Sequence, residues 1–203
     1  METTQPVPLW QVTGRFCAPL PEDWRNRLAA RLGQRPRRIG ILAELALYGA
    51  LDCLSDAQEG ALPGDAIVRV CSLRGAATAI GEVLAQNRQE LPMPFSFLQS
   101  QTSQLLPALA AALKWQGDAA IVVTRDATGL AQLAAQQAGA NGMLLGWVEE
   151  LPCQSVWVRL VRSEAKVTGF VAAQDLTELV SPETRYWRSG RDGLEIACAI
   201  DTL

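Results

Sequence analysis

The chain has 203 residues, of which 49% are hydrophobic and 19% are charged, and its net charge is −3. This composition is typical of one well-buried globular protein and excludes a disordered chain. The charge balance excludes a nucleic-acid-binding surface. We expect a cytoplasmic protein without a membrane span, since no apolar run is long enough to cross a bilayer and the first residues lack the pattern of a signal peptide.

The most restrictive feature of the composition is the absence of histidine. Without histidine the chain lacks the usual general base near neutral pH and the commonest metal ligand. Its five cysteines form no Cys-x-x-Cys pair, so we expect neither a metal site nor a cofactor. The simplest interpretation is that all five are small buried side chains in a reducing compartment; they are Cys17, Cys53, Cys71, Cys153 and Cys198.

The first quarter of the sequence predicts a strand and two helices. Alternation over residues 8–16 favours a strand, and Glu22 and Asp23 then open a short basic helix. Residues 35–38 read Arg-Pro-Arg-Arg, which is either a solvated helix end or a docking point for phosphate or an acidic carrier protein. Residues 39–54 are apolar on nearly all sides, which predicts a helix buried in the middle of the fold.

The next part predicts a strand over residues 66–72 and a helix that starts near residue 74. Residues 91–94 contain two prolines and predict an extended linker. Phe95 and Phe97 then lead into a helix over residues 100–115. Ser100, Thr102 or Ser103 would cap this helix, and Pro107 would start or kink its regular part.

Residues 118–149 form the stretch around which the rest is organised. Residues 119–123 are a continuous apolar run, which suggests a strand buried on both faces. A tight turn, a helix through Leu130 and an apolar strand over residues 143–148 follow, as in a βαβ crossover. Ligands in such sheets meet the carboxyl ends of strands, so residues 124–129 are the candidate site.

This turn resembles the nucleophile loop of the β-ketoacyl synthases, which have the thiolase fold. Residues 124–130 read Thr-Arg-Asp-Ala-Thr-Gly-Leu, where the family has Thr-Ala-Cys-Ala-Ser-Gly-Leu. Aligning Gly129 and Leu130 places Asp126 at the position of the nucleophilic cysteine. Residues 94–97 and 142–149 are similar to the segments before and after this loop in the family, and the resemblance spans about residues 35–150.

The resemblance implies a layered α/β fold, the βαβαβ half of a thiolase fold, with a mixed sheet of about five strands. We expect a single domain over residues 1–203, with a synthase-like core over 1–150 and a strand-rich tail over 151–203. In the tail, residues 156–161 and 167–173 predict a hairpin and residues 194–200 a last strand. Half of a layered fold leaves one face open, which the tail, a second copy or another subunit must cover.

The family's chemistry needs a thiolate and two histidines, and this chain has aspartate at the nucleophile position and no histidine. We therefore expect a non-catalytic accessory subunit, similar to short chain-length-factor proteins of fatty-acid-like, polyketide or polyene biosynthesis. Its expected partners are a second copy or a complete ketoacyl synthase, and an acyl carrier protein. Residues that would contact the loop, an interface or a ligand are Thr124, Arg125, Thr128, Gly129, Phe95, Phe97 and Gln101.

Two alternatives remain open at the level of sequence. One is a homodimeric protein that binds an acyl chain or another small ligand without chemistry. The other is an enzyme for a small acyl substrate in which Asp126 is the general base. Independently of both, an aspartate before Ala-Thr-Gly-Leu is well suited to cap the helix that follows, because its side chain accepts free backbone N–H groups.

Overall fold

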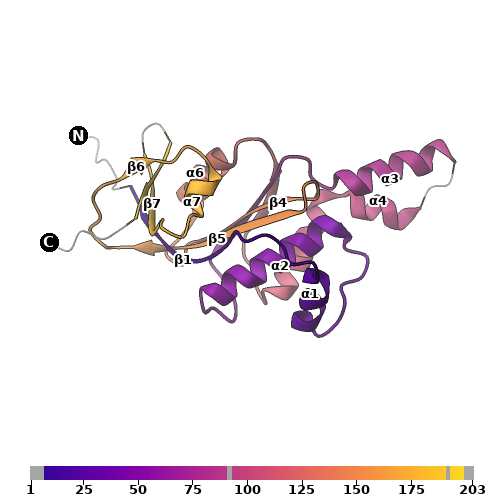
Figure 1. The fold of residues 1–203 in the computed structure, drawn as a ribbon, viewed down its shortest axis with the longest axis horizontal. Helices are drawn as coiled ribbons and strands as arrows, with labels where there is room; N and C mark the ends of the chain where they lie inside the picture. The colour runs from indigo at the N-terminus through magenta and orange to yellow at the C-terminus, as the bar shows by residue number, and fades with distance from the viewer. Residues whose placement is uncertain (1–6, 91–92, 191–192, 199–203) are drawn as a thin grey trace.

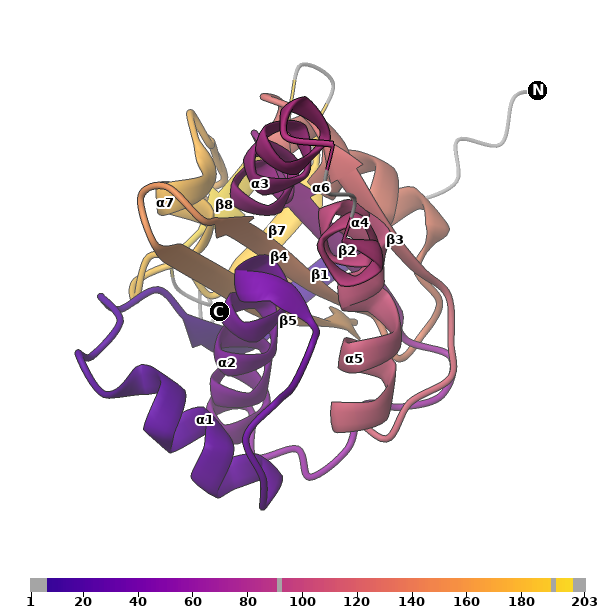
Figure 2. The same cartoon turned by 90° about the vertical axis from the view of Figure 1, so that its right-hand side faces the viewer.

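The computed structural model describes residues 7–90, 93–190 and 193–198 and contains a single mixed sheet between two helical layers (Figures 1 and 2). The described part of the sheet has eight strands in the order β3-β2-β4-β5-β1-β7-β8-β6. The expected α/β architecture is therefore present. The sheet exceeds the five strands expected for the core because the strands of the tail extend it instead of forming a separate unit.

The strands are β1 (Leu9–Phe16), β2 (Ile67–Ser72), β3 (Ala119–Val123), β4 (Met143–Glu149), β5 (Gln154–Ser163), β6 (Val171–Ala172), β7 (Tyr186–Ser189) and β8 (Leu194–Ala197). The helices are α1 (Trp24–Leu32), α2 (Gly40–Asp56), α3 (Ala77–Arg88), α4 (Pro94–Ser100), α5 (Leu105–Ala112), α6 (Ala127–Gln137) and α7 (Leu176–Leu179), and a 3-10 turn, η1 (Thr102–Gln104), precedes α5.

The predicted βαβ crossover is confirmed, but its first strand is not buried. β2 pairs in parallel with both β3 and β4, and α6 connects β3 to β4 across it. β3 forms the edge of the sheet, where Val122 is 37% and Val123 is 56% exposed. The expectation of burial on both faces was wrong because an apolar run does not by itself distinguish a central strand from an edge strand.

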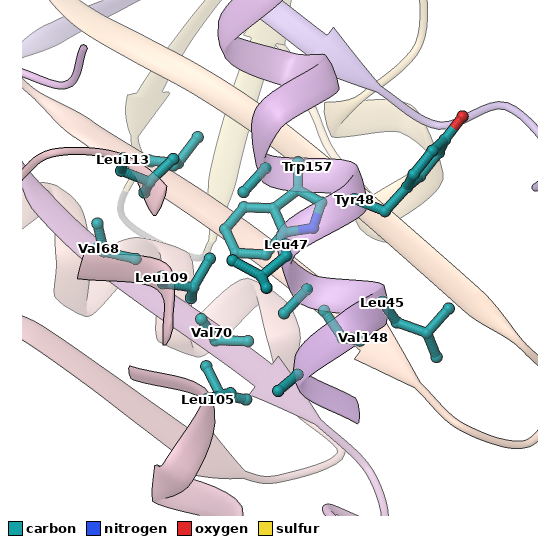
Figure 3. Close-up of a cluster of buried hydrophobic side chains, with 14 of the residues drawn as sticks. Leu45, Leu47, Tyr48, Val68, Val70, Leu105, Leu109, Leu113, Val148 and Trp157 are labelled. Atoms are coloured by element: carbon teal, nitrogen blue, oxygen red, sulfur yellow. The ribbon is translucent and has the colours of Figure 1, made fainter. Parts of the chain in front are cut away.

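One face of the sheet is covered by α2, with α1 and α5 beside it (Figure 2). The prediction of a central, nearly all-apolar helix is confirmed, and most of its side chains are buried. The fully buried Trp157 of β5 lies between this helix and the sheet (Figure 3). Its ring leaves no room for side chains at Gly49 or Gly146, since a Cβ would lie 2.4 Å and 2.6 Å from it, respectively.

The other face is covered by α6 and by part of the tail. The apolar side of α6 packs on β2 and β4 and also contacts β7 and β8. Leu179, Val180, Leu194 and Ile196 of the tail belong to this second hydrophobic cluster. The sequence analysis considered the tail, a second copy or another subunit as the cover of the open face. The tail covers at least part of that face.

The pairing of the tail strands differs from the prediction. β5 forms its hairpin with β4 and pairs on its other side with β1, whereas β6 pairs with β8. The expected hairpin of residues 156–161 with 167–173 was therefore wrong. β7 was not predicted, because its four residues lie in a polar context. The last strand ends at Ala197 in the structure, and residues 199–200 of the predicted strand lie outside the described residues.

The segment between β2 and β3 also departs from the prediction of one helix over residues 100–115. Phe95 and Phe97 lie inside α4, and the chain is extended at Gln101 before η1 and α5. No side chain caps α5, so the predicted cap by Ser100, Thr102 or Ser103 was wrong. Pro107 lies in the first turn of α5, which agrees with the alternative that it starts the regular part of the helix. Of the predicted linker over residues 91–94, residues 91–92 lie outside the described residues, and α4 already begins at Pro94.

The helices α3 and α4 pack side by side and protrude from the end of the sheet (Figure 1); we call this pair the helical arm. Two buried carboxylates at the end of β4 fix its base. Glu149 accepts a hydrogen bond from the backbone N–H of Leu73, and Glu150 accepts one from that of Thr78 at 2.7 Å. Glu150 thereby satisfies a free donor in the first turn of α3, which no local side chain caps.

Candidate functional site

The turn after β3 has the geometry of a strand-to-helix elbow with Asp126 at its tip. The Asp126 carboxylate accepts hydrogen bonds from the backbone N–H of Gly129 at 2.7 Å and from the hydroxyl of Thr128 at 3.0 Å. The backbone N–H of Asp126 donates to the hydroxyl of Thr124 at 3.0 Å. The predicted helix cap is therefore confirmed, and it uses the loop's own hydroxyl groups.

The Asp126 carboxylate lies so close to residue 129 that only glycine fits there. A Cβ at residue 129 would lie 2.2 Å from one carboxylate oxygen of Asp126 and 2.7 Å from its carboxyl carbon. Any side chain there would displace the carboxylate from the end of α6. The Gly129 that supported the resemblance thus has a local physical role in this chain, independent of catalysis.

A cleft of about 630 Å³ opens beside the elbow. Arg125, Asp126 and Thr128 lie on one of its walls, and Trp147 and Val156 of the sheet contribute apolar surface. A narrower, apolar recess beneath α6 shares Trp147 and Val156 with it. The volume lies within the range of small-ligand sites, which combine apolar walls with a few polar groups.

The opposite wall of the cleft comes from the tail and was missed by the sequence analysis. It includes Asp175 and Thr177 at the start of α7, and Ser181 after it. The Asp175 carboxylate accepts hydrogen bonds from the backbone and hydroxyl of Thr177 at 2.8 Å and 2.6 Å. The bond from the Thr177 side chain, above all, lowers the pKa of Asp175. The Asp-x-x-Glu spacing of residues 175–178 was a signal that could have indicated this helix start.

Arg15 holds this wall against the body of the protein. Its guanidinium donates to the backbone carbonyl of Ser181 and, at 2.8 Å, to that of Thr184. Arg15 belongs to β1, so the first strand of the sheet positions a wall that is contributed by the last quarter of the chain. This connection was not visible from sequence, because the two segments lie more than 160 residues apart.

The carboxylates of the cleft have a structural role. Both nearby carboxylates, Asp126 and Asp175, already cap helix starts, and both are solvent-exposed. A general base needs a positioned group with a suitable environment, which an exposed capping carboxylate lacks. Within the described residues, no group of three His, Cys, Asp or Glu side chains is arranged to hold a metal ion.

The predicted contact residues separate into two places. Arg125, Asp126 and Thr128 line the cleft, and Thr124 and Gly129 shape the loop behind it. Phe95, Phe97 and Gln101 lie elsewhere, on the helical arm and at its end. The Arg38 guanidinium stacks over the Phe95 ring at 4.4 Å, so this arginine of the 35–38 cluster contacts the arm. Arg35 and Arg37 are exposed, as in the solvated interpretation of that cluster.

The cysteines differ from the expectation that all are buried. Cys53 and Cys71 are buried, whereas Cys17, Cys153 and Cys198 are exposed, and Cys17 lines the cleft. Burial raises the pKa of Cys53 and raises that of Cys71 to about 12. Composition alone could not separate the two groups, because cysteine is small enough to lie on either side of a strand end or loop.

We expect three of the five thiols to react with a thiol reagent in the native protein at pH 8. Cys53 and Cys71 should react only after unfolding, because their burial keeps the reagent away from both thiols. Burial also raises the pKa of Cys153, so this exposed thiol should react more slowly than an ordinary one. The measurement is the stoichiometry of labelling with and without denaturant. A Cys153→Ser variant should lower the native count by one, and labelling of four or five thiols in the folded wild type would contradict the structure.

Replacing Asp126 with alanine should lower the free energy of unfolding by about 1 kcal/mol, because the N–H of Gly129 loses its acceptor. Asp126→Asn is the matched control, since asparagine caps helices about as well as aspartate. Chemical denaturation of the three proteins measures the difference. Equal destabilisation by alanine and asparagine would show that charge, and not capping, is what this position contributes.

Comparison with known proteins adds information about the fold. No protein-family model and no curated protein matches the sequence. Solved structures do match. The ishigamide ketosynthase/chain length factor aligns with a TM-score of 0.56 at 15% identity, over 81% of this chain and 63% of that chain. This chain thus spans less than two thirds of that protein's matched chain.

Two further structures align at similar levels. The ketosynthase ApeO in complex with its chain length factor ApeC, from Xenorhabdus doucetiae, gives a TM-score of 0.53 at 14% identity, over 94% of this chain and 98% of the matched chain. The third structure is AntDE:AntF, a type II PKS acyl-carrier protein in complex with its ketosynthase bound to the hexaketide. It aligns with a TM-score of 0.59 at 14% identity, over 85% of this chain and 72% of the matched chain.

These likenesses establish that the fold is thiolase-like, with structural similarity to ketosynthase and chain-length-factor proteins. The resemblance first read from the elbow residues is therefore supported at the level of fold. Among the described helices, none is both long and apolar enough to cross a membrane.

Proposed function

We propose that this chain is a non-catalytic, ketoacyl-synthase-like accessory subunit of the chain-length-factor type, which pairs with a complete ketoacyl synthase. The observation that carries the proposal is the elbow. It is a strand-to-helix turn whose sequence resembles a nucleophile loop, but the residue at the aligned position is Asp126, whose carboxylate caps α6. Because the aligned nucleophile position holds aspartate and the chain has no histidine, the cysteine–histidine set of a condensing enzyme is not available at this loop.

The open edge of the sheet supports the pairing. The backbone groups of Asp118 and Thr124 point toward β2. The carbonyl of Asp118 accepts from the N–H of Val68, and the N–H of Thr124 donates to the carbonyl of Ser72, both at 2.9 Å. Because backbone groups alternate along a strand, those of Ile121 and Val123 face the open edge. An apolar edge strand without proline or charge is a template for pairing with another chain.

The solved structures suggest the kind of partner. Two of them are a ketosynthase with a chain length factor, and the third is a type II PKS acyl-carrier protein in complex with its ketosynthase. By analogy, we propose a synthase subunit as the partner of this chain and an acyl carrier protein as a second contact, in a fatty-acid-like or polyketide pathway of the cytoplasm.

The test is co-expression with the complete ketoacyl synthase encoded nearest to this chain's gene. We expect a complex by gel filtration with light scattering, and condensing activity that is lost when the synthase's own cysteine is replaced by alanine. An Asp126→Cys variant of this chain should not restore activity to that dead complex. Acyl transfer by the Asp126→Cys variant, or a monomer that ignores synthase and carrier protein, would overturn the proposal.

The cleft beside the elbow favours one second candidate, a protein that binds an acyl chain or another small ligand without chemistry. Its volume of about 630 Å³ and its apolar recess beneath α6 are the observations in its favour. Native mass spectrometry of the purified protein distinguishes the two. A co-purifying lipid that is lost in a Val156→Trp variant would support ligand binding at this cleft.

A further inference from the structure

The two carboxylates that face the cleft beside the elbow cap their helices with one oxygen each. Oδ1 of Asp126 accepts both hydrogen bonds of its cap, from Gly129 and from Thr128. Oδ1 of Asp175 likewise accepts all three bonds at the start of α7, two of them from Thr177. No described residue donates to Oδ2 of either aspartate. Each capping carboxylate therefore keeps one acceptor oxygen for a further donor.

The charges on the two walls of the cleft do not cancel. On the elbow wall, the positive charge of Arg125 offsets that of its neighbour Asp126. On the tail wall, Asp175 forms no ion pair with a described residue, and its lowered pKa keeps it ionised at neutral pH. Arg15 and Glu178 lie next to this wall and contribute opposite charges. The tail wall is therefore negative.

An apolar floor lies between the two walls. Trp147 of β4 and Val156 of β5 are directly opposite each other in the antiparallel pair, and both line the cleft and the recess beneath α6. The Trp147 side chain is only half-buried. Tryptophan is the aromatic residue that attracts a cation over its ring most strongly. A carboxylate and an indole that border the same cavity are a combination that recognises ammonium groups.

We propose that the cleft binds a protonated organic amine with an apolar chain, with the ammonium group between Asp175 and Trp147 and the chain along Val156 toward the recess. The cleft volume of about 630 Å³ is in the range of small-ligand sites. A carboxylate ligand would meet two aspartates for one arginine, and an alcohol would gain nothing from the charge. The inference specifies the ligand of the second candidate function and does not depend on pairing with a synthase.

The experiment titrates the purified chain with octylammonium chloride, octanol and sodium octanoate by isothermal titration calorimetry at low salt. The three probes have the same chain length and differ in the charge of the head group. We expect octylammonium to bind about threefold or more tightly than octanol, and octanoate to bind most weakly. The advantage of octylammonium should shrink when salt is added, since the carboxylates are exposed to solvent.

The decisive variant is Asp175→Asn, which removes the charge and keeps the cap, because asparagine caps helices about as well as aspartate. We expect it to weaken octylammonium about two- to fivefold and to leave octanol unchanged. The matched control is Asp65→Asn. It makes the same change in net charge at the amino end of β2, whereas the elbow lies at the carboxyl ends of the strands, and it should bind both probes like wild type.

The outcomes separate this inference from the functions proposed above. Octanoate that binds as tightly as octylammonium overturns the inference and leaves the cleft as an acyl-chain site. Absence of binding by all three probes overturns the inference and the second candidate function together. Equal weakening by Asp65→Asn and Asp175→Asn would show unspecific attraction to an acidic protein and also overturns the inference. Pairing with a synthase is decided separately, by co-expression.

A second measurement uses the wild-type chain alone. Cys17 lines the cleft, whereas the exposed Cys198 lies outside it. Octylammonium in the cleft should slow the labelling of Cys17 by a thiol reagent and leave the labelling of Cys198 unchanged, as followed by mass spectrometry of the peptides. Octanoate at the same concentration should protect Cys17 less. Protection of Cys17 by octanoate alone would contradict a site for amines.

Discussion

Replacing Trp157 with alanine is expected to lower the free energy of unfolding by about 3–5 kcal/mol. The indole is fully buried between α2 and the sheet, and both sides of it contact backbone at Gly49 and Gly146. Because glycine has no side chain to move into the vacated space, the cavity cannot close by rearrangement of neighbours. Thermal denaturation should show a midpoint about 10 °C lower or more.

The matched control for this prediction is Trp157→Phe. The indole N–H donates to the hydroxyl of Ser155 at 2.9 Å, and that hydroxyl donates to the carbonyl of Leu45 in α2 at 2.8 Å. Phenylalanine keeps most of the volume of the indole and removes one hydrogen bond. Trp157→Phe should therefore lower the free energy of unfolding clearly less than Trp157→Ala does. A loss below about 1 kcal/mol for Trp157→Ala would mean that α2 does not depend on this contact.

The second large effect is expected for Glu59→Ala, which should destabilise the protein by about 3–5 kcal/mol. The Arg159 side chain is only 1% exposed, and its Nε donates to the Glu59 carboxylate at 2.9 Å. Its Nη1 donates to the carbonyls of Asn141 and Leu160, both at 2.8 Å. Removal of Glu59 would leave a buried guanidinium without a counter-charge, which costs more than the ion pair itself contributes.

A double variant distinguishes this explanation from simple loss of packing. Glu59→Ala combined with Arg159→Met removes the buried charge together with its partner and keeps the volume of the side chain. It should therefore be more stable than Glu59→Ala alone, as measured by urea denaturation with a common m-value. A double variant that is less stable than the single one would show that the carbonyl contacts of Arg159 matter more than its charge.

Elements with a strong local pattern were predictable from the sequence. The apolar sides of α2 and the run from β3 through α6 to β4 carry their periodicity within a few turns, so no distant residue was needed to recognise them. The cap at Asp126 was predictable for the same reason, because an N-cap depends only on the three residues that follow it.

Features that depend on which strands are neighbours were not predictable. The apolar run of β3 fits an edge as well as a centre, and β5 was assigned to a hairpin with the wrong strand. Half of the cleft was missed because its wall at Asp175 and Ser181 is brought to the elbow by distant contacts, among them the hydrogen bonds of Arg15 in β1. Pairing across more than a hundred residues leaves no periodic signal in a single sequence.

The placement of β1 in the sheet has a consequence for how the chain is made. Its neighbours are β5 and β7, and the part of the chain that supplies them begins only at residue 154. On a ribosome that adds about 5–20 residues each second, β1 waits on the order of ten seconds for its first strand partner. The helices of the first half can form early, whereas closure of the sheet is a late event dominated by distant contacts, which slows folding.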